Sequence, residues 1–190
     1  YSMIDSTDMA ISHAHKAYDL YRLKNLKADA AMMIGVLLSD QKKYADAVNW
    51  LLIADAETPG NFYIYESLLS AYLHLGKKEE AYLIAKNLYN YDWRSARIFN
   101  SILESYLAVK KGDDLKKFLL DELAFEGSDE EYRGFLFLHL AQIYLRKDEN
   151  VQAKTILDKA DSSFKVAYDK EHGVFKVIER MNWSLKTGKK

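Results

Sequence analysis

The residues that could do acid–base or metal chemistry are poorly placed for it. His13 and His15 are two residues apart, so on a helix they point to different faces and make a poor metal pair. Asp169 and His172 are three apart and can touch along a helix, which favours a surface ion pair over a catalytic pair. These spacings predict no metal site and no catalytic site.

Two carboxylate pairs, Glu79-Glu80 and Asp113-Asp114, lie where helices are expected to begin. Acidic side chains there complement the helix dipole, and we do not interpret them as a general acid and base. His74 and His139 lie on predicted helices, where each faces a binding groove or is an ordinary surface residue. The chain also lacks a Gly-x-Ser-x-Gly elbow, a phosphate-binding glycine loop and a His-Glu-x-x-His motif. We therefore expect no enzymatic activity and no cofactor.

Composition narrows the class of protein further. The 190 residues include 27 Lys and Arg against 28 Asp and Glu, and this balance argues against a nucleic-acid binder. Apolar residues make up 49%, too many for a disordered chain, and there is no cysteine to form a disulfide. No apolar run approaches the roughly 20 residues that span a bilayer, so no membrane insertion is expected. A cytoplasmic and a periplasmic location are both compatible with these features.

The segments that hold these residues are predicted to be helices. Apolar residues recur at three- and four-residue spacing over 63–75 and 135–145, the pattern of helical stripes. The single proline fits, because helix interiors exclude proline. Short breaks between the stripes alternate with longer ones, which is the rhythm of helical hairpins in a row. This predicts an all-α fold.

The hairpins repeat with a measurable period. Ala47, Ala81 and Leu115 are 34 residues apart in each step, and Ala153 follows after 38. Large apolar or aromatic residues precede these positions by thirteen and nine residues, as Leu68 and Tyr72, Ile102 and Tyr106, and Leu140 and Tyr144 do. A single hairpin cannot bury its apolar faces alone, so the sequence predicts stacked neighbours.

This pattern resembles the tetratricopeptide repeat (TPR), a 34-residue helix-turn-helix motif. Three segments carry most of the resemblance: Gly35, Ala47, Leu51, Ala54 and Pro59; Tyr72, Gly76 and Ala81; and Ala141, Tyr144, Ala153, Leu157 and Ala160. Leu69, Leu103 and Leu115 depart from the small residues of the family. The resemblance implies a right-handed superhelical solenoid of stacked antiparallel helix pairs.

The same resemblance gives expected boundaries. Residues 1–27 hold an N-terminal helix over 5–24, capped by Asp5 or Ser6, as the remnant of an earlier repeat. Four repeats follow over 28–61, 62–95, 96–129 and 134–167. Residues 168–190 form a capping helix and tail. The acidic segment 126–131 is expected to be a mobile loop or to bind something basic.

In this architecture the first helix of each repeat lines a concave groove that holds a partner. Met32 and Val36 stand where the family's carboxylate clamp has Lys and Asn, so recognition of chaperone tails is disfavoured. Met32, Phe135 and Leu138 instead suit an apolar or amphipathic peptide, unless part of this stripe is intramolecular core. The expected groove residues are Met32, Val36, Tyr63, Glu66, Ser70, His74, Arg97, Asn100, Glu104, Phe135, Leu138, Gln142 and Arg146.

The functional hypothesis is a non-enzymatic protein–protein interaction module, an adaptor or assembly subunit of a bacterial envelope or secretion complex. One alternative is a secretion chaperone for a translocator or effector protein. Another is the peptide-sensing domain of a larger regulator. Self-association is a further expectation, because some of the 14 tyrosines at exposed edges can contact a second copy of the chain, although repeat packing accounts for most of them.

Overall fold

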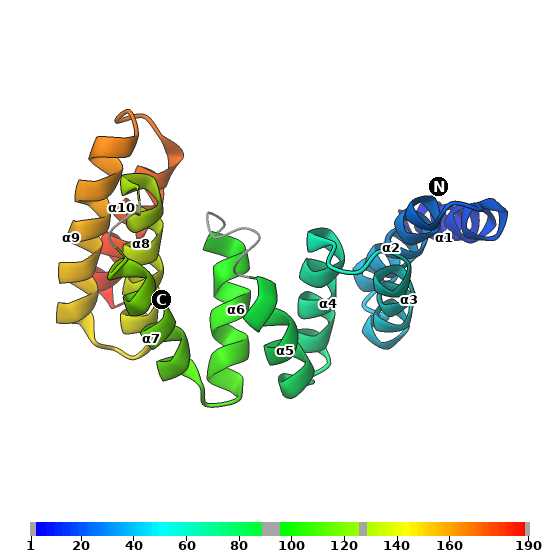
Figure 1. Cartoon of the computed structure of the whole chain (residues 1–190), viewed down its shortest axis with the longest axis horizontal. Helices are drawn as coiled ribbons and strands as arrows, with labels where there is room; N and C mark the ends of the chain where they lie inside the picture. Colours follow the sequence, from blue (N-terminus) through cyan, green and yellow to red (C-terminus); the bar gives the residue numbers. More distant parts are fainter. Residues whose placement is uncertain (1–2, 89–95, 126–128, 189–190) are drawn as a thin grey trace. The chain divides into compact units, whose positions relative to one another are not determined.

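The computed structural model describes residues 3–88, 96–125 and 129–188, and within these ranges all regular secondary structure is helical (Figure 1). This confirms the predicted all-α class. The helices are α1 (Met3–Leu20), α2 (Lys24–Asp40), α3 (Tyr44–Glu57), α4 (Phe62–His74), α5 (Lys78–Leu88), α6 (Ala96–Ala108), α7 (Gly112–Leu123), α8 (Glu130–Arg146), α9 (Asn150–Ala167) and α10 (Gly173–Thr187).

Four short turns join consecutive helices, α2 to α3, α4 to α5, α6 to α7 and α8 to α9. Each turn contains one residue in the left-handed backbone region: Lys42, Gly76, Lys110 and Asp148, with φ between 59° and 69°. The first three are 34 residues apart and the last follows after 38. The turn geometry therefore recurs at the same spacing as the periodic alanines.

Backbone hydrogen bonds explain why the helices stop at these turns. In the first turn the amide of Lys43 donates to the carbonyl of Leu38 at 2.9 Å, reaching back to the last helical turn. Lys77 donates to Tyr72 and Glu149 to Tyr144 in the same way, at 3.0 Å each. This is the arrangement that ends a helix with one left-handed residue, and it satisfies carbonyls that would otherwise lack a partner.

The chain divides into two compact units. The first contains α1 to α5 with residues 100–109, and the second contains residues 96–99 with α7 to α10. The four periodic residues, Ala47, Ala81, Leu115 and Ala153, are 0–1% exposed, so each serves the core of its unit.

Close helix contact in the first unit depends on Gly35. A Cβ atom added there would lie 2.6 Å from Cγ of Leu51 and 3.2 Å from the carbonyl oxygen of Ala47. Only a residue without a side chain lets α2 approach α3 this closely. Gly134 of α8 plays the same part in the second unit, where an added Cβ would lie 2.6 Å from the ring of Phe164.

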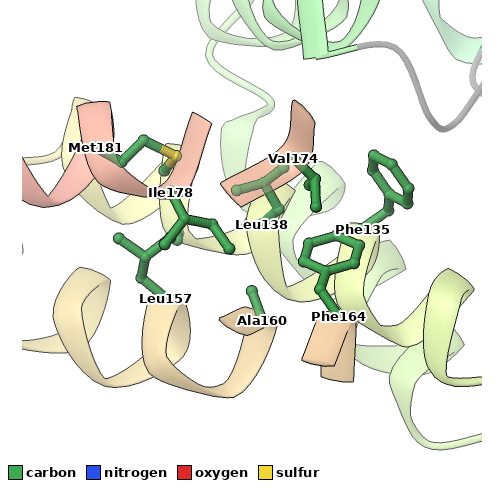
Figure 2. Packing of buried hydrophobic residues seen from close by; sticks show 9 residues of the cluster. Phe135, Leu138, Leu157, Ala160, Phe164, Val174, Ile178 and Met181 are labelled. Carbon is green, nitrogen blue, oxygen red and sulfur yellow. The ribbon is translucent and has the colours of Figure 1, made fainter. Parts of the chain in front are cut away.

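The first and last helices close the two units. In the first unit Ala14 of α1 packs with Ile34 and Leu38 of α2 and Ala47 of α3. In the second unit Figure 2 shows Val174, Ile178 and Met181 of α10 packed against α8 and α9. Their partners in this cluster are Phe135, Leu138, Ala141, Leu157, Ala160 and Phe164.

Some expected boundaries differ from the structure. α1 ends at Leu20 rather than near residue 24, and α2 begins at Lys24 rather than at 28. Asp5 and Ser6 lie within α1 rather than at its first residue. Residues 126–128 of the expected acidic loop lie outside the described residues. Asp129 caps α8 by accepting a hydrogen bond from the amide of Tyr132 at 2.7 Å.

Within the described ranges, every helix is too short or too polar to cross a membrane.

Candidate partner-binding surface

The exposed residues of α2 past its first turn fall on one row. They are Asp29, Met33, Val36 and Asp40, spaced by four, three and four residues, so they share one side of the helix. The other sides are occupied, because α2 packs against α1, α3 and α4. Met33 is 55% exposed and Val36 39% exposed, so the row presents apolar side chains to solvent between two carboxylates.

A second exposed row runs along α4, which packs beside α2. Its exposed members are Tyr63, Ser70 and His74, and Tyr63 is 64% exposed. Asn61 fixes the start of this helix by accepting a hydrogen bond from the amide of Tyr63 at 2.9 Å. We call the exposed residues of both rows together the α2–α4 face: Asp29, Met33, Val36, Asp40, Tyr63, Ser70 and His74.

His74 is held at the end of its row. Its ring stacks on that of Tyr44 with 4.4 Å between centroids, and its Nδ1 lies 2.8 Å from the carbonyl oxygen of Ser70. With Nδ1–H as donor, this contact orients the ring along the helix. These contacts fix the position of the His74 ring at the edge of the α2–α4 face.

The two charged residues of the α2–α4 face are both acidic. Asp29 and Asp40 belong to the α2–α4 face, and Glu66 is half-buried on α4. On α6, Asn100 and Glu104 are exposed. The α2–α4 face contains no Lys or Arg. Its apolar side chains therefore share the face with carboxylates and with no basic residue.

The remaining expected groove residues of the first unit and of α6 are placed as follows. Met32 is half-buried, one position from the exposed Met33. The side chain of Arg97 lies outside the described residues.

The interpretation of Phe135 and Leu138 as exposed anchors is wrong. Phe135 is 6% exposed and Leu138 0% exposed, and both belong to the cluster that α8, α9 and α10 share (Figure 2). Helix α10 supplies apolar side chains to the side of α8 that the resemblance assigned to a partner. Gln142 is half-buried and Arg146 is exposed in the last turn of α8.

His139 is neither a groove residue nor a surface residue. It is fully buried and its ring stacks on that of Phe99, with centroids 3.9 Å apart and planes within 4°. Burial lowers its pKa to about 3, so the imidazole is neutral near pH 7.

The other candidates for chemistry have structural roles. His172 caps α10 by accepting, through Nδ1, from the amide of Val174 at 3.4 Å. Asp113 lies in the first turn of α7 and pairs with Lys147, which lowers the pKa of this carboxyl. His15 meets the edge of Trp50 while His13 is exposed, so the two point apart as expected. Among the described residues, no group of three or more His, Cys, Asp or Glu side chains could hold a metal.

One exposed apolar feature escaped the sequence reasoning. Leu20 and Leu23, in the connection between α1 and α2, are 77% and 61% exposed. A signal was present in the sequence: Leu23 precedes a helix, where Ser, Thr, Asp or Asn is preferred.

No protein-family model and no curated protein matches the chain. Solved structures of MamA are similar to it. A MamA RS-1 double mutant aligns with a TM-score of 0.58 at 13% identity, covering 86% of this chain and 88% of that one. A MamA AMB-1 structure aligns with a TM-score of 0.51 at 15% identity, covering 88% and 94%. MamA is a TPR-like helical solenoid, and the likeness shows that this chain has the same class of fold.

Proposed function

We propose that the protein is a non-enzymatic interaction scaffold whose α2–α4 face binds a partner segment with both apolar and basic side chains. One observation carries the proposal: Met33, Val36 and Tyr63 are exposed on the α2–α4 face, and the charged residues of that face are Asp29 and Asp40. Apolar side chains would anchor the partner, and its Lys or Arg residues would meet the carboxylates.

The chemistry of the anchors supports this kind of partner. Tyr and Met are enriched at protein interfaces, and methionine adapts its shape to different partner side chains. Charge complementarity adds specificity and speeds association more than it adds affinity. An acidic segment of the same apolar content would therefore be rejected.

A pair of helical peptides tests the proposal. One peptide carries a leucine face and a lysine face, and in the other every lysine is replaced by glutamate. We expect the labelled leucine–lysine peptide to bind the full chain, as measured by fluorescence anisotropy, and the leucine–glutamate peptide to bind at least about tenfold more weakly. Equal binding of the two peptides would remove the electrostatic part of the proposal.

Matched variants place the binding on the face. Val36→Ser with Tyr63→Ser removes two anchors and should weaken binding by about tenfold or more. Leu52→Ser, at a 45% exposed position on α3 of the same unit, should leave it unchanged. Asp29→Asn with Asp40→Asn should weaken binding and reduce its dependence on salt.

The finer role that we propose is that of an adaptor or assembly subunit in a bacterial envelope or secretion complex. A secretion chaperone would use the same face differently, by keeping one client protein soluble. Co-expression with the partner separates these roles: a chaperone is required for the partner's solubility, whereas an adaptor joins a partner that is soluble without it.

A further inference from the structure

The connection between α1 and α2 exposes three large side chains within four residues. Leu20 is 77% exposed, Tyr21 38% and Leu23 61%. Single exposed leucines are common on protein surfaces, but neighbouring ones form a patch. We call Leu20, Tyr21, Arg22, Leu23 and Lys24 the α1–α2 turn.

The two leucines of this turn contribute little to the fold. Leu20 is the last residue of α1 and is mostly in solvent. Leu23 occupies the capping position of α2 but makes no side-chain capping hydrogen bond. At the corresponding positions Asn61, Asp129 and His172 cap their helices, whereas α3, α7 and α9 begin at Lys43, Lys111 and Glu149 without a side-chain cap; among these helices α2 alone has an aliphatic residue there. Two leucines that neither cap a helix nor pack in the core are better explained by a contact with another molecule.

Basic side chains surround these leucines. Arg22 and Lys24 are exposed within the turn, and Lys16 precedes Leu20 by one helical turn on the same side of α1. Lys27 follows Leu23 at the same spacing, and its Nζ lies 5.0 Å from the ring centre of Tyr18. Asp19 is the one acidic residue between Lys16 and Lys27. The local charge is therefore positive in a chain whose net charge is −1.

We propose that the α1–α2 turn docks on the surface of a lipid bilayer that contains anionic headgroups. The leucines enter the boundary between headgroups and acyl chains, Tyr21 lies at the headgroup level, and the basic side chains contact phosphates. Apolar side chains bordered by Lys and Arg are the pattern of segments that lie in a membrane interface, where tyrosine is also enriched.

The exposure and charge of the turn favour a bilayer over a folded protein as the occupant. Its leucines lie at the ends of two helices, exposed and bordered by basic side chains, which suits the interface of an anionic bilayer. The charges of α2 also determine which side of the protein faces the bilayer. Lys24 and Lys27 lie at its first turns, whereas Asp29 and Asp40 of the α2–α4 face follow. An anionic surface attracts the turn and repels that face, which stays available to a protein partner.

Co-sedimentation of the full chain with vesicles tests the inference. We expect binding to vesicles of phosphatidylcholine mixed with phosphatidylserine, weak binding to phosphatidylcholine alone, and release at high salt. Leu20→Ser with Leu23→Ser should lower the partition coefficient by about tenfold or more. Arg22→Gln with Lys24→Gln should remove most of the preference for phosphatidylserine.

Two controls keep the result specific. Leu83→Ser, at a 60% exposed position on α5 of the same unit, should bind vesicles like the wild type. Val36→Ser with Tyr63→Ser should also bind vesicles normally, so the lipid inference and the proposed protein-binding face can fail independently. Circular dichroism checks that each variant keeps its helical content.

Two outcomes would overturn the inference. One is the absence of vesicle binding by the wild type under low salt. The other is unchanged vesicle binding by the leucine double variant. If that variant then loses self-association in sedimentation velocity, the turn is assigned to a protein contact instead.

Discussion

The imidazole ring of His139 lies parallel to the phenyl ring of Phe99, with 3.9 Å between the two ring centres and 4° between their planes. His139 belongs to α8 and is fully buried, and Phe99 of α6 is 1% exposed. Burial makes the charged imidazole unfavourable and lowers its pKa from 6.5 to about 3. A titratable group thus forms part of an apolar core.

This contact predicts a pH-dependent stability. The unfolded chain binds a proton at His139 below about pH 6.5, but the folded protein does not until about pH 3. Its contribution to stability is therefore fully present above pH 6.5 and is lost as the pH falls. Between pH 6 and pH 5, before most carboxylates titrate, the free energy of unfolding should fall by up to about 1.4 kcal/mol per pH unit.

Urea unfolding of His139→Phe measures this effect. The variant keeps a ring against Phe99 and removes this titration, so its stability should fall less steeply over that pH range than that of the wild type. Identical slopes for the wild type and His139→Phe would show that His139 does not titrate as described.

The left-handed turn residues predict a gain in stability. Lys42 and Lys110 have φ of 61°, a conformation that is costly for a residue with a Cβ and free for glycine. Lys42→Gly and Lys110→Gly should each raise the free energy of unfolding by roughly 0.5–1 kcal/mol, after the greater freedom of glycine in the unfolded chain is subtracted.

Two comparisons check the turn prediction by thermal melting. Gly76→Ala, at φ 69°, should lower stability by about 1 kcal/mol because alanine resists that conformation. Lys86→Gly, inside α5, should lower it by a similar amount because glycine disfavours the helix. If Lys42→Gly were as harmful as Lys86→Gly, the turn geometry described above would be contradicted.

Close packing of α2 on α3 predicts the effect of adding one methyl group. Gly35→Ala should lower stability by about 1–3 kcal/mol from overpacking, partly offset by the higher helix propensity of alanine. Gly173→Ala is the matched control, since no atom lies within 4 Å of its added Cβ. We expect that variant to be neutral or slightly more stable in the same melting experiment. Equal melting temperatures for both would disprove the close contact.

Leu138 is buried and Val36 is exposed, although both were expected to line the same groove. Leu138→Glu places a charge in the core of the second unit and should abolish its cooperative unfolding or cost more than about 3 kcal/mol. Val36→Glu lies on an exposed row and should change stability by less than about 0.5 kcal/mol. Tolerance of Leu138→Glu in urea unfolding would place Leu138 outside the core.

The repeat period could be predicted because small and large apolar residues keep fixed spacings along helices. Ala47, Ala81 and Ala153 are buried, and Gly35 sits against Leu51 as a close approach requires. Helix spacing also selected Val36, Tyr63 and Ser70, which are exposed on their rows. Each of these features depends on contacts between residues of the same helix or of two adjacent helices.

What covers the apolar side of α8 could not be predicted in the same way. Periodicity finds the apolar sides of a helix but does not say whether a partner or another part of the chain covers them. Phe135 and Leu138 satisfy both interpretations, and the choice depends on where α10 packs. His139 was misplaced for the same reason, because an imidazole on an apolar helix is buried only if α6 supplies a ring beside it.

Backbone amide shifts in nuclear magnetic resonance, followed while the leucine–lysine peptide is added to the full chain, test the central claim most directly. The account predicts saturable shifts that cluster on the α2–α4 face, around Met33, Val36, Tyr63 and Ser70, and that disappear in the Val36→Ser, Tyr63→Ser variant. Saturable shifts confined to α3 and α5, or shifts that persist in that variant, would contradict it.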